Sequence, residues 1–349
     1  MILKIYDRKI SRRVEYFNSF SLSLRYDSVA SSFGFSFFAD LENEEHRILC
    51  KIAQYQLARL EHNGELLISA FILSQALQDS ATPSLKSFSG YSIPGVLEDC
   101  QIPPSAYPLQ SDGLTLKEIA EKLMRPFQIK IDIDPSVEHL MNQPYKETTA
   151  DPTQTVKDYL VELATQKNII VSHTPIGHLL FTRAKVGQKP IIDFGEGLIA
   201  DSYNLIFPGQ AMHSHIWVMK QADSDGGNAG QSLIENPYVP TSTTAFRPKV
   251  IIQSSGDDLD TDKAAQNALA SELKNLKLVI TVDRWDVNGI ILKPNSIVSV
   301  QNPRLFMDKK TNWFVEQVDY EGDAEKLTAT ITCVLPEVYS GKQPKYIFS

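Results

Sequence analysis

The chain has 349 residues, of which 42% are hydrophobic and 22% are charged, the composition of an ordinary globular protein. At roughly 150 residues per domain, this length predicts two or three domains. Acidic side chains outnumber basic ones by 42 to 34, giving a formal net charge of -8. That balance argues against a surface that holds nucleic acid by neutralising its phosphates.

The start of the chain, MILKIYDRKISRR, has a short apolar run interrupted by Lys4 and Asp7. We therefore expect no signal peptide, and no apolar run reaches the ~18 residues of a membrane helix. The sequence predicts a protein made and kept in the cytoplasm of its producing cell. Cys50, Cys100 and Cys333 are far apart and form no CxxC pair, which predicts reduced, mostly buried thiols.

The first hundred residues read mainly as antiparallel strands. Apolar and polar residues alternate through residues 17–38, which predicts two strands joined at Asp27 to Ala30. A second hairpin is predicted around the turn 61–64, where Asn63 and Gly64 supply the positive φ values of a tight turn.

The pattern changes after the proline-rich stretch 102–108. Apolar residues at helical spacing follow Thr115 and Glu118, which form a capping box, and predict a helix that ends before Pro126. A second helix is predicted from Val156 to Ala164, with Asp151-Pro152 as N-cap and first-turn proline. A hairpin with its turn at residues 174–177 completes a small α+β unit.

Strands return from Pro190 onward, with one helix predicted near 261–276. Trp285 and Trp313 fall beside strand patterns, where burial in the core is expected. Between Ala222 and Gln231 the segment ADSDGGNAGQ has no apolar anchor, which predicts a mobile insertion loop.

Several groups of residues resemble sites. His213 and His215 could share one strand face as an HxH metal pair, but no carboxylate or cysteine stands nearby in sequence at ligand spacing, so half-buried or exposed histidines are the better interpretation. His173 and His178 are interpreted as polar residues flanking a turn.

Two acidic segments also resemble binding sites. Asp223-Ser224-Asp225-Gly226 resembles the opening of a calcium loop but lacks the closing acidic residue. Asp132 and Asp134 alternate with isoleucines, which predicts carboxylates facing solvent. The nucleotide-binding and hydrolase motifs GxGxxG, GxxxxGK[ST] and GxSxG are absent.

The stretch GYSIPGVLEDCQIP, residues 90–103, poses a question of its own. Glu98, Asp99 and Cys100 could form a thiol site, but adjacent carboxylates disfavour a thiolate. Gly90 and Gly95 allow backbone conformations closed to other residues, and Pro94 fixes a turn. The stretch is therefore predicted to turn a corner between two modules, and we assign no catalytic, cofactor-binding or metal-binding residue anywhere in the chain.

Taken in order, these segments resemble the baseplate hub proteins of contractile-tailed, Mu-like phages. They resemble more distantly the N-terminal hub region of type VI secretion spike proteins. The resemblance rests on FNSFSLSLRYDSVASSFGFSF, LEHNGELLISAFI, SFSGYSIPGVLEDCQI, LTLKEIAEKLMRPFQIKI, TQTVKDYLVELATQKNIIVSHTPIGHLLFTRA, DRWDVNGIILKPNSIVSVQNPRLF, WFVEQVDYEGD and LPEVYS. It covers nearly the whole chain.

The resemblance implies an α+β, mostly β protein with two antiparallel tube-like β-barrel domains and an intervening small α+β domain. The expected domains are residues 1–105, completed by later strands if needed, residues 106–189, and residues 190–349 with the inserted helix. The function implied is that of a structural, non-enzymatic virion protein without cofactors.

In that role, six barrels of a homotrimer would form a pseudo-hexameric ring that joins a six-fold tail tube to a three-fold spike. The implied partners are a second and third copy, the tail tube protein, the central spike protein and other baseplate proteins, with no membrane insertion. The protein would be assembled in the host cytoplasm and reside in the virion baseplate. DNA would only pass through the ring, and the acidic composition suits a conduit whose carboxylates repel the DNA backbone.

Two alternatives remain open from the residues themselves. A β-rich metal-dependent hydrolase would use the region of His213 and His215. A carbohydrate- or receptor-binding virion module would expose clustered aromatic residues, whereas the aromatic residues here lie mostly at alternating, core-like positions.

Overall fold

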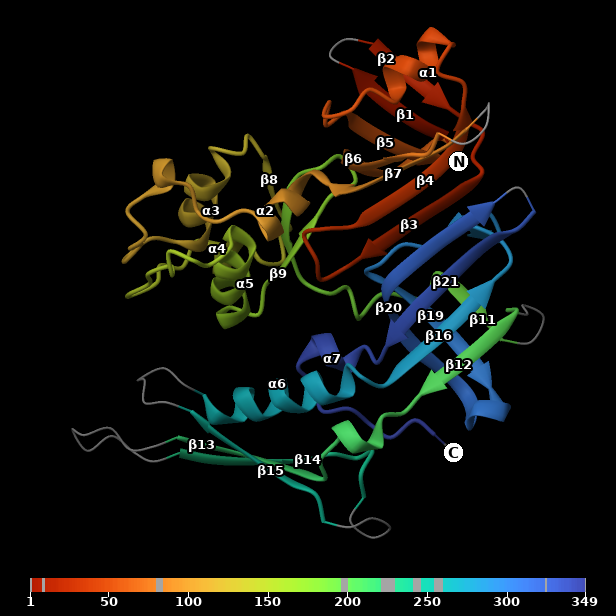
Figure 1. Ribbon diagram of the computed structural model, residues 1–349. Coiled ribbons are helices and arrows are strands. Elements are labelled where there is room, and N and C mark those ends of the chain that lie inside the picture. Colours follow the sequence, from red (N-terminus) through yellow and green to blue (C-terminus); the bar gives the residue numbers. More distant parts are fainter. Residues whose placement is uncertain are drawn as a thin grey trace. The chain divides into compact units, whose positions relative to one another are not determined.

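The structure is a computed structural model that describes residues 2–7, 10–79, 84–195, 200–220, 230–240, 246–253, 260–323 and 325–348. The chain divides into two compact units (Figure 1). The first comprises Met1–Arg183 and Asp319–Thr328, and the second comprises Ala184–Val318 and Ala329–Ser349.

An antiparallel sheet forms the body of the first unit, in the strand order β3-β4-β7-β6-β5-β1-β2. The strand beside β3 is β20, whose end Asp319–Asp323 belongs to this unit. The elements are β1 (Ile2–Asp7), β2 (Ile10–Val14), β3 (Ser19–Arg25), β4 (Ser32–Ala39), α1 (Glu44–Leu49), β5 (Leu57–His62), β6 (Glu65–Leu77), β7 (Ser84–Ser92) and β20 (Met307–Asp323).

Alternation of large apolar residues with small polar ones gives this sheet one buried face. Phe20 in β3 stands opposite Phe35 in β4, which stands opposite Phe88 in β7. The rings of Phe35 and Phe88 stack with centroids 5.1 Å apart, and all three side chains are buried. The strands predicted in residues 17–38 are confirmed, because the period of two puts every second residue into the core.

The predicted second hairpin is confirmed as β5 and β6. Its turn consists of Asn63 and Gly64 alone, with φ of 50° and 81°, while Glu61 and His62 belong to β5.

Sequence reasoning did not predict β1, β2 or α1. In β1 only Leu3 and Ile5 are buried on the core side, too few residues to show a period.

A three-stranded sheet with the order β8-β10-β9 and several helices make up the small α+β part. Its own apolar core includes Leu116, Leu160 and Phe181. The elements are α2 (Val96–Asp99), α3 (Leu116–Met124), β8 (Ile131–Ile133), α4 (Glu138–Met141), α5 (Val156–Gln166), β9 (Ile170–His173) and β10 (Leu179–Thr182). Short 3₁₀ turns lie at Ile93–Gly95 and Pro104–Ala106.

The two predicted helices of this part are present. The capping box of α3 is confirmed: Thr115 Oγ1 accepts from the Glu118 amide, and a Glu118 carboxylate oxygen accepts from the Thr115 amide. The predicted cap of α5 is wrong, since the N-cap is Thr155, whose hydroxyl accepts from the Asp158 amide at 3.1 Å. Asp151 instead accepts from Thr153 in the preceding turn.

The second unit contains a sheet in which β12, β16, β21 and β20 are neighbours in that order, and β19 pairs with both β20 and β11. Trp285 and Trp313 are both buried, as expected. The elements are β11 (Ile192–Phe194), β12 (Ser202–Ile206), β16 (Lys277–Val282), β17 (Asp286–Val287), β18 (Ile290–Ile291), β19 (Ser296–Asn302), β21 (Leu327–Val334) and α7 (Glu337–Ser340).

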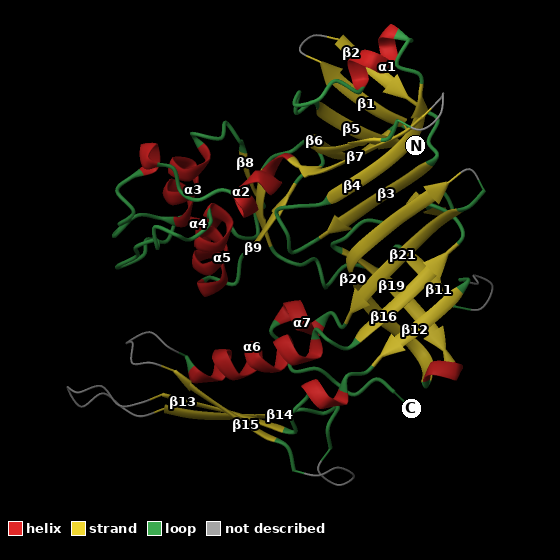
Figure 2. Ribbon diagram, in the orientation of Figure 1, coloured by secondary structure: helices red, strands yellow, loops and turns green. Residues whose placement is uncertain are grey.

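A separate layer of the same unit consists of a three-stranded sheet, β14-β13-β15, and one long helix (Figure 2). The helix packs on one face of the sheet, with Asp260 as its N-cap. It ends three residues before the predicted boundary of 276. The elements are β13 (His215–Lys220), β14 (Gly230–Glu235), β15 (Pro248–Gln253) and α6 (Thr261–Leu273).

The loop predicted at Ala222 to Gln231 lies mostly outside the described residues, which resume at Gly230. Gly230 and Gln231 are not loop residues, because they open β14 and pair with Lys220 and Met219. The carboxylates and glycine of the calcium-like segment, 223–226, are also outside the described residues.

The observed fold is mostly β with antiparallel sheets, as predicted. Neither unit shows a closed barrel among its described strands, and closure into tubes stays a prediction. The three cysteines are free, Cys50 and Cys333 being buried and Cys100 half-buried, in agreement with the sequence. No helix of the described ranges is both long and apolar enough to cross a membrane.

Candidate functional site

The stretch 90–103 turns the corner from β7 into the α+β part, as predicted, but the reason given for its glycines is wrong. Gly95 has an ordinary helical φ of -58°, and Gly90 is not among the glycines with positive φ. Both are needed for close packing. A Cβ on Gly90 would lie 1.8 Å from the Phe71 carbonyl oxygen, and one on Gly95 would lie 2.3 Å from the Tyr91 ring.

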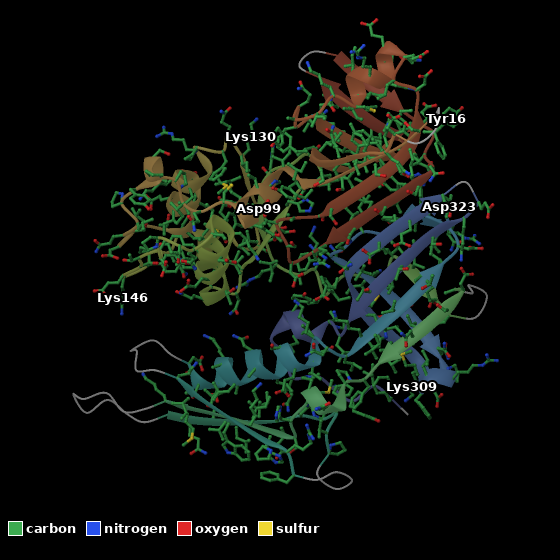
Figure 3. The ribbon with its side chains drawn as sticks, in the orientation of Figure 1. Tyr16, Asp99, Lys130, Lys146, Lys309 and Asp323 are labelled. Carbon is green, nitrogen blue, oxygen red and sulfur yellow. The ribbon has the colours of Figure 1, made fainter. Side chains whose placement is uncertain are left out.

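The acidic residues of the corner serve separate contacts. Tyr91 donates its hydroxyl to Asp99 at 2.5 Å, and burial together with this bond raises the pKa of the tyrosine. Glu98 accepts from Ser28 Oγ at 3.3 Å. Figure 3 shows Asp99 at the start of the α+β part. These contacts hold the corner together, and they do not bring the two carboxylates to Cys100.

A partly buried hydrogen bond joins the α+β part to the first sheet. His173 in β9 places Nε2 2.7 Å from the hydroxyl of Ser31, next to β4. Ser31 is itself buried and donates its amide to Ser92 Oγ at 3.1 Å. Burial lowers the pKa of His173 from 6.5 to about 4, so the ring is neutral near pH 7. His173 ends β9 and flanks the turn 174–177, as interpreted. The sequence did not show that it also forms the joint between two modules.

Asp132 in β8 and Asp134 just after it do not converge on one point. Asp132 lies 3.0 Å from Nδ1 of His178, because β8 runs parallel to β10 and the residue preceding β10 comes alongside. Asp134 accepts from the amide and hydroxyl of Ser136. Each carboxylate therefore serves its own side-chain bond at a half-exposed position.

His213 and His215 do not form a pair. His213 lies 2.7 Å from a carboxylate oxygen of Glu272 and donates its amide to the other oxygen at 2.9 Å. Lys249 lies 3.0 Å from the same carboxylate. The interpretation of half-buried or exposed histidines is confirmed, since the side chains of His213 and His215 are 30% and 18% exposed. The buried carboxylate beside His213 comes from 59 residues away on α6, where sequence spacing could not show it. This cluster ties α6 to β13 and β15, and no group of three metal-ligating side chains occurs among the described residues.

A second buried glutamate, Glu316, links the C-terminal end of α6 to the main sheet of its unit. Glu316 in β20 accepts from the Tyr339 hydroxyl at 2.6 Å and lies 3.4 Å from Lys274 and 3.7 Å from Lys277. Burial raises the pKa of the Cys333 thiol, and the nearby Glu316 carboxylate raises it further. This thiol therefore stays protonated and unreactive.

The outer face of the first sheet is polar and hollowed. Serines alternate with the buried phenylalanines, and Ser19 and Ser36 are hydrogen-bonded at 2.6 Å. A hollow of about 530 Å³ lies over this face. Glu321 and Asp323, at the end of β20, line it with these hydroxyls. Asp323 is labelled in Figure 3.

Exposed apolar side chains gather on the face of the β14-β13-β15 sheet that α6 does not cover. We call this surface the β13 face; it consists of the exposed Met219, Leu233, Phe246, Val250 and Ile252 and the half-buried Trp217. The ring of Phe246 lies 6.1 Å from that of Trp217. Sequence reasoning missed this surface. Continuous apolar runs in β13 (residues 216–219) and β15 (residues 250–252) indicate that these strands have two apolar faces. The expectation that aromatic residues occupy core positions does not hold here.

The fold is that of phage tail proteins. The chain matches the 43 kDa tail protein of prophage MuSo2 from Shewanella oneidensis with a TM-score of 0.78 at 18% identity, over 97% of this chain and 98% of that one. It matches the tail protein of Neisseria meningitidis MC58 with a TM-score of 0.77 at 18% identity, over 98% of both chains. The E. coli c3393 protein, a component of the type VI secretion system, matches at 11% identity with a TM-score of 0.54, over 99% of this chain and 80% of that one.

Sequence comparison finds similarity to baseplate hub proteins. Residues 94–183 match the family model of the second domain of gp44-like baseplate hub proteins. Over 269 residues the chain is 24% identical to the baseplate hub protein gp44 of Escherichia phage Mu, covering 74% of this chain and 69% of that one. The predicted resemblance to Mu-like baseplate hub proteins is confirmed. These relatives are described as tail, baseplate or secretion-system proteins, which agrees with a non-enzymatic protein.

Proposed function

We propose that this protein is the structural hub of a contractile phage-tail baseplate. One observation carries the proposal: two tail proteins share the fold along 97% or more of the chain. The gp44-like second domain supports the same role.

The proposed hub is a homotrimer in which every chain supplies two tube-like β domains. These domains are residues 1–105 and 190–349, with the α+β domain 106–189 between them. The boundary between the two compact units, at Arg183/Ala184, lies close to the proposed start of the last domain and supports it. The first unit holds both the first β domain and the α+β domain, together with Asp319–Thr328. Three copies would present six similar β domains, which lets a three-fold assembly contact a six-fold one.

The proposed partners are the tail tube protein on one side, the central spike protein on the other, and further baseplate proteins around the ring. The protein would assemble in the host cytoplasm and stay in the virion baseplate. DNA would pass through the ring without being held, because a net charge of -8 opposes stable contact with phosphates.

Removing the gene from an inducible prophage tests the proposed role. We expect induced cells to release particles without attached, complete contractile tails, and a plasmid copy of the gene to restore them. Electron microscopy of the lysates measures this. Complete, contractile tails in the absence of the protein would refute a hub function.

Light scattering of the purified chain tests the trimer. The expected mass is three times that of one chain, and the trimer should become more abundant as concentration rises. A discrete dimer or tetramer would contradict the proposed symmetry.

A further inference from the structure

The turn that joins β19 to β20 holds an aromatic residue in an unusual backbone conformation. A short 3₁₀ turn, Pro303–Leu305, is followed by Phe306, whose φ and ψ are 59° and 25°. Glycine adopts this left-handed region readily, whereas a bulky side chain is strained there. Phe306 is also 65% exposed, so packing of its ring in the core does not account for the strain. Residues held in such conformations gather at binding sites and switch regions.

The surrounding hairpin fixes the backbone of this turn. The Asn302 side chain accepts from the amide of Arg304 at 3.1 Å, and the amide of Phe306 donates to the Pro303 carbonyl at 3.1 Å. Asn302 pairs across the hairpin with Met307, whose side chain is fully buried. The aromatic ring is therefore presented from a rigid base, which reduces the conformational entropy lost when a partner binds.

Positive charge accompanies the exposed ring. We call residues 303–309 the β19–β20 tip; it carries two basic residues, Arg304 and Lys309, and one acidic residue, Asp308. Both basic side chains are exposed, and neither forms an ion pair with another described residue. Figure 3 labels Lys309 at the end of the sheet of the second unit. The tip is thus locally basic, although the chain as a whole has a net charge of -8.

The small size of the tip decides which class of partner it fits. Stable contact with nucleic acid requires several phosphates to be neutralised, and two cations in an acidic chain do not supply that. Binding to a lipid surface requires a broad apolar face, and the tip exposes one aromatic ring. A rigid aromatic side chain beside an arginine is, by contrast, typical of the hot spot of a protein interface.

We propose that the β19–β20 tip binds an acidic surface of a partner protein. The Phe306 ring fills an apolar pocket in that surface, and Arg304 and Lys309 lie against carboxylates at the rim of the pocket. Opposite charges at the rim orient the two proteins as they meet. The inference rests on the proposed function, because the partner surface belongs to the assembled particle.

Phe306→Gly separates binding from folding. Glycine adopts the left-handed region without strain, so the purified variant should be at least as stable as the wild type in thermal denaturation. In an inducible prophage, the same variant should lower the number of complete tails at least tenfold, as expected when a hot-spot side chain is lost. Asn288→Gly, at an exposed turn position with a φ of 53°, is the matched control and should leave the number of tails unchanged.

Charge reversal tests the chemistry of the partner. Arg304→Glu with Lys309→Glu should also lower the number of complete tails at least tenfold, whereas Lys117→Glu, at an exposed position of α3, should not. A photocrosslinker at position 306, used in purified particles, should join the tip to a protein segment that carries Asp or Glu beside apolar residues. Replacing those carboxylates with lysine should restore tails to the charge-reversed hub.

Three outcomes would overturn the inference. The first is a lower melting temperature for Phe306→Gly, which would show that the ring is kept for folding. The second is a normal number of tails in either tip variant. The third is a crosslink to DNA, to lipid or to a protein segment without carboxylates, or no crosslink at all. Each of these leaves the hub role standing, since failure of that role appears separately, as complete tails in particles that lack the protein.

Discussion

Close packing at single residues, rather than unusual backbone angles, shapes the corner between β7 and the α+β domain. Gly90 faces the Phe71 carbonyl across the β6–β7 pair. There a side chain would push two paired strands apart. Proteins tolerate such overpacking poorly, at a cost of about 1–3 kcal/mol.

Gly90→Ala should therefore lower the free energy of unfolding by about 1–3 kcal/mol. Urea denaturation measures the change. Gly187→Ala is the control, since a Cβ there meets nothing within 4 Å and the backbone needs no positive φ. Equal stability of the two variants would show that the sheet relaxes around the added methyl group.

His173 gives the joint between sheet and α+β domain a dependence on pH. Burial lowers its pKa from 6.5 to about 4 in the folded protein. Above pH 6.5 neither the folded nor the unfolded chain binds a proton at this ring, so stability is full. Between 6.5 and 4 only the unfolded chain is protonated, and stability falls as the pH falls.

We expect His173 to remove roughly 2–3 kcal/mol of folding free energy as the pH is lowered through this window. The difference in unfolding free energy between wild type and His173→Gln, measured at several pH values, isolates this contribution. His139→Gln, at an exposed position, should keep the wild-type dependence. Parallel curves for wild type and His173→Gln would contradict the prediction.

Helix ends show how one element depends on one local bond. Thr155 caps α5, and Asp151-Pro152, four residues earlier, does not. Thr155→Ala should cost about 1 kcal/mol of stability, because it leaves an amide of the first turn without its acceptor. Pro152→Ala should change it by less than about 0.5 kcal/mol. Thermal and urea denaturation measure the stability of the two variants. A larger loss of stability for Pro152→Ala than for Thr155→Ala would support the predicted cap at Asp151-Pro152.

At the scale of the whole assembly, the proposed conduit depends on negative charge. Glu321 and Asp323 line the hollow over the polar, serine-bearing face of the first sheet. In the proposed trimer, three copies would present these two carboxylates around the passage. Neutralising both should let phosphates linger and slow genome delivery several-fold. Phage carrying Glu321→Gln and Asp323→Asn, with Glu138→Gln as control, can be compared by the rate of DNA ejection. Unchanged ejection would count against a repelling lumen.

The sequence by itself determined the local structure and the general class of this protein. Alternation placed β3 and β4, Asn63-Gly64 placed a tight turn, and Thr115 with Glu118 placed the start of α3, because each signal lies within a few neighbouring residues. The order of such segments was enough to indicate a resemblance to baseplate hub proteins.

The tertiary structure alone decided which distant side chains meet. Glu272 reaches His213 across 59 residues, and β8 lies beside β10 although nearly fifty residues separate them. Sequence spacing carries no record of such contacts, since they depend on how packed elements stack. For the same reason, the apolar runs of β13 and β15 do not tell which face is covered, and only the placement of α6 on one face left the other exposed (Figure 2).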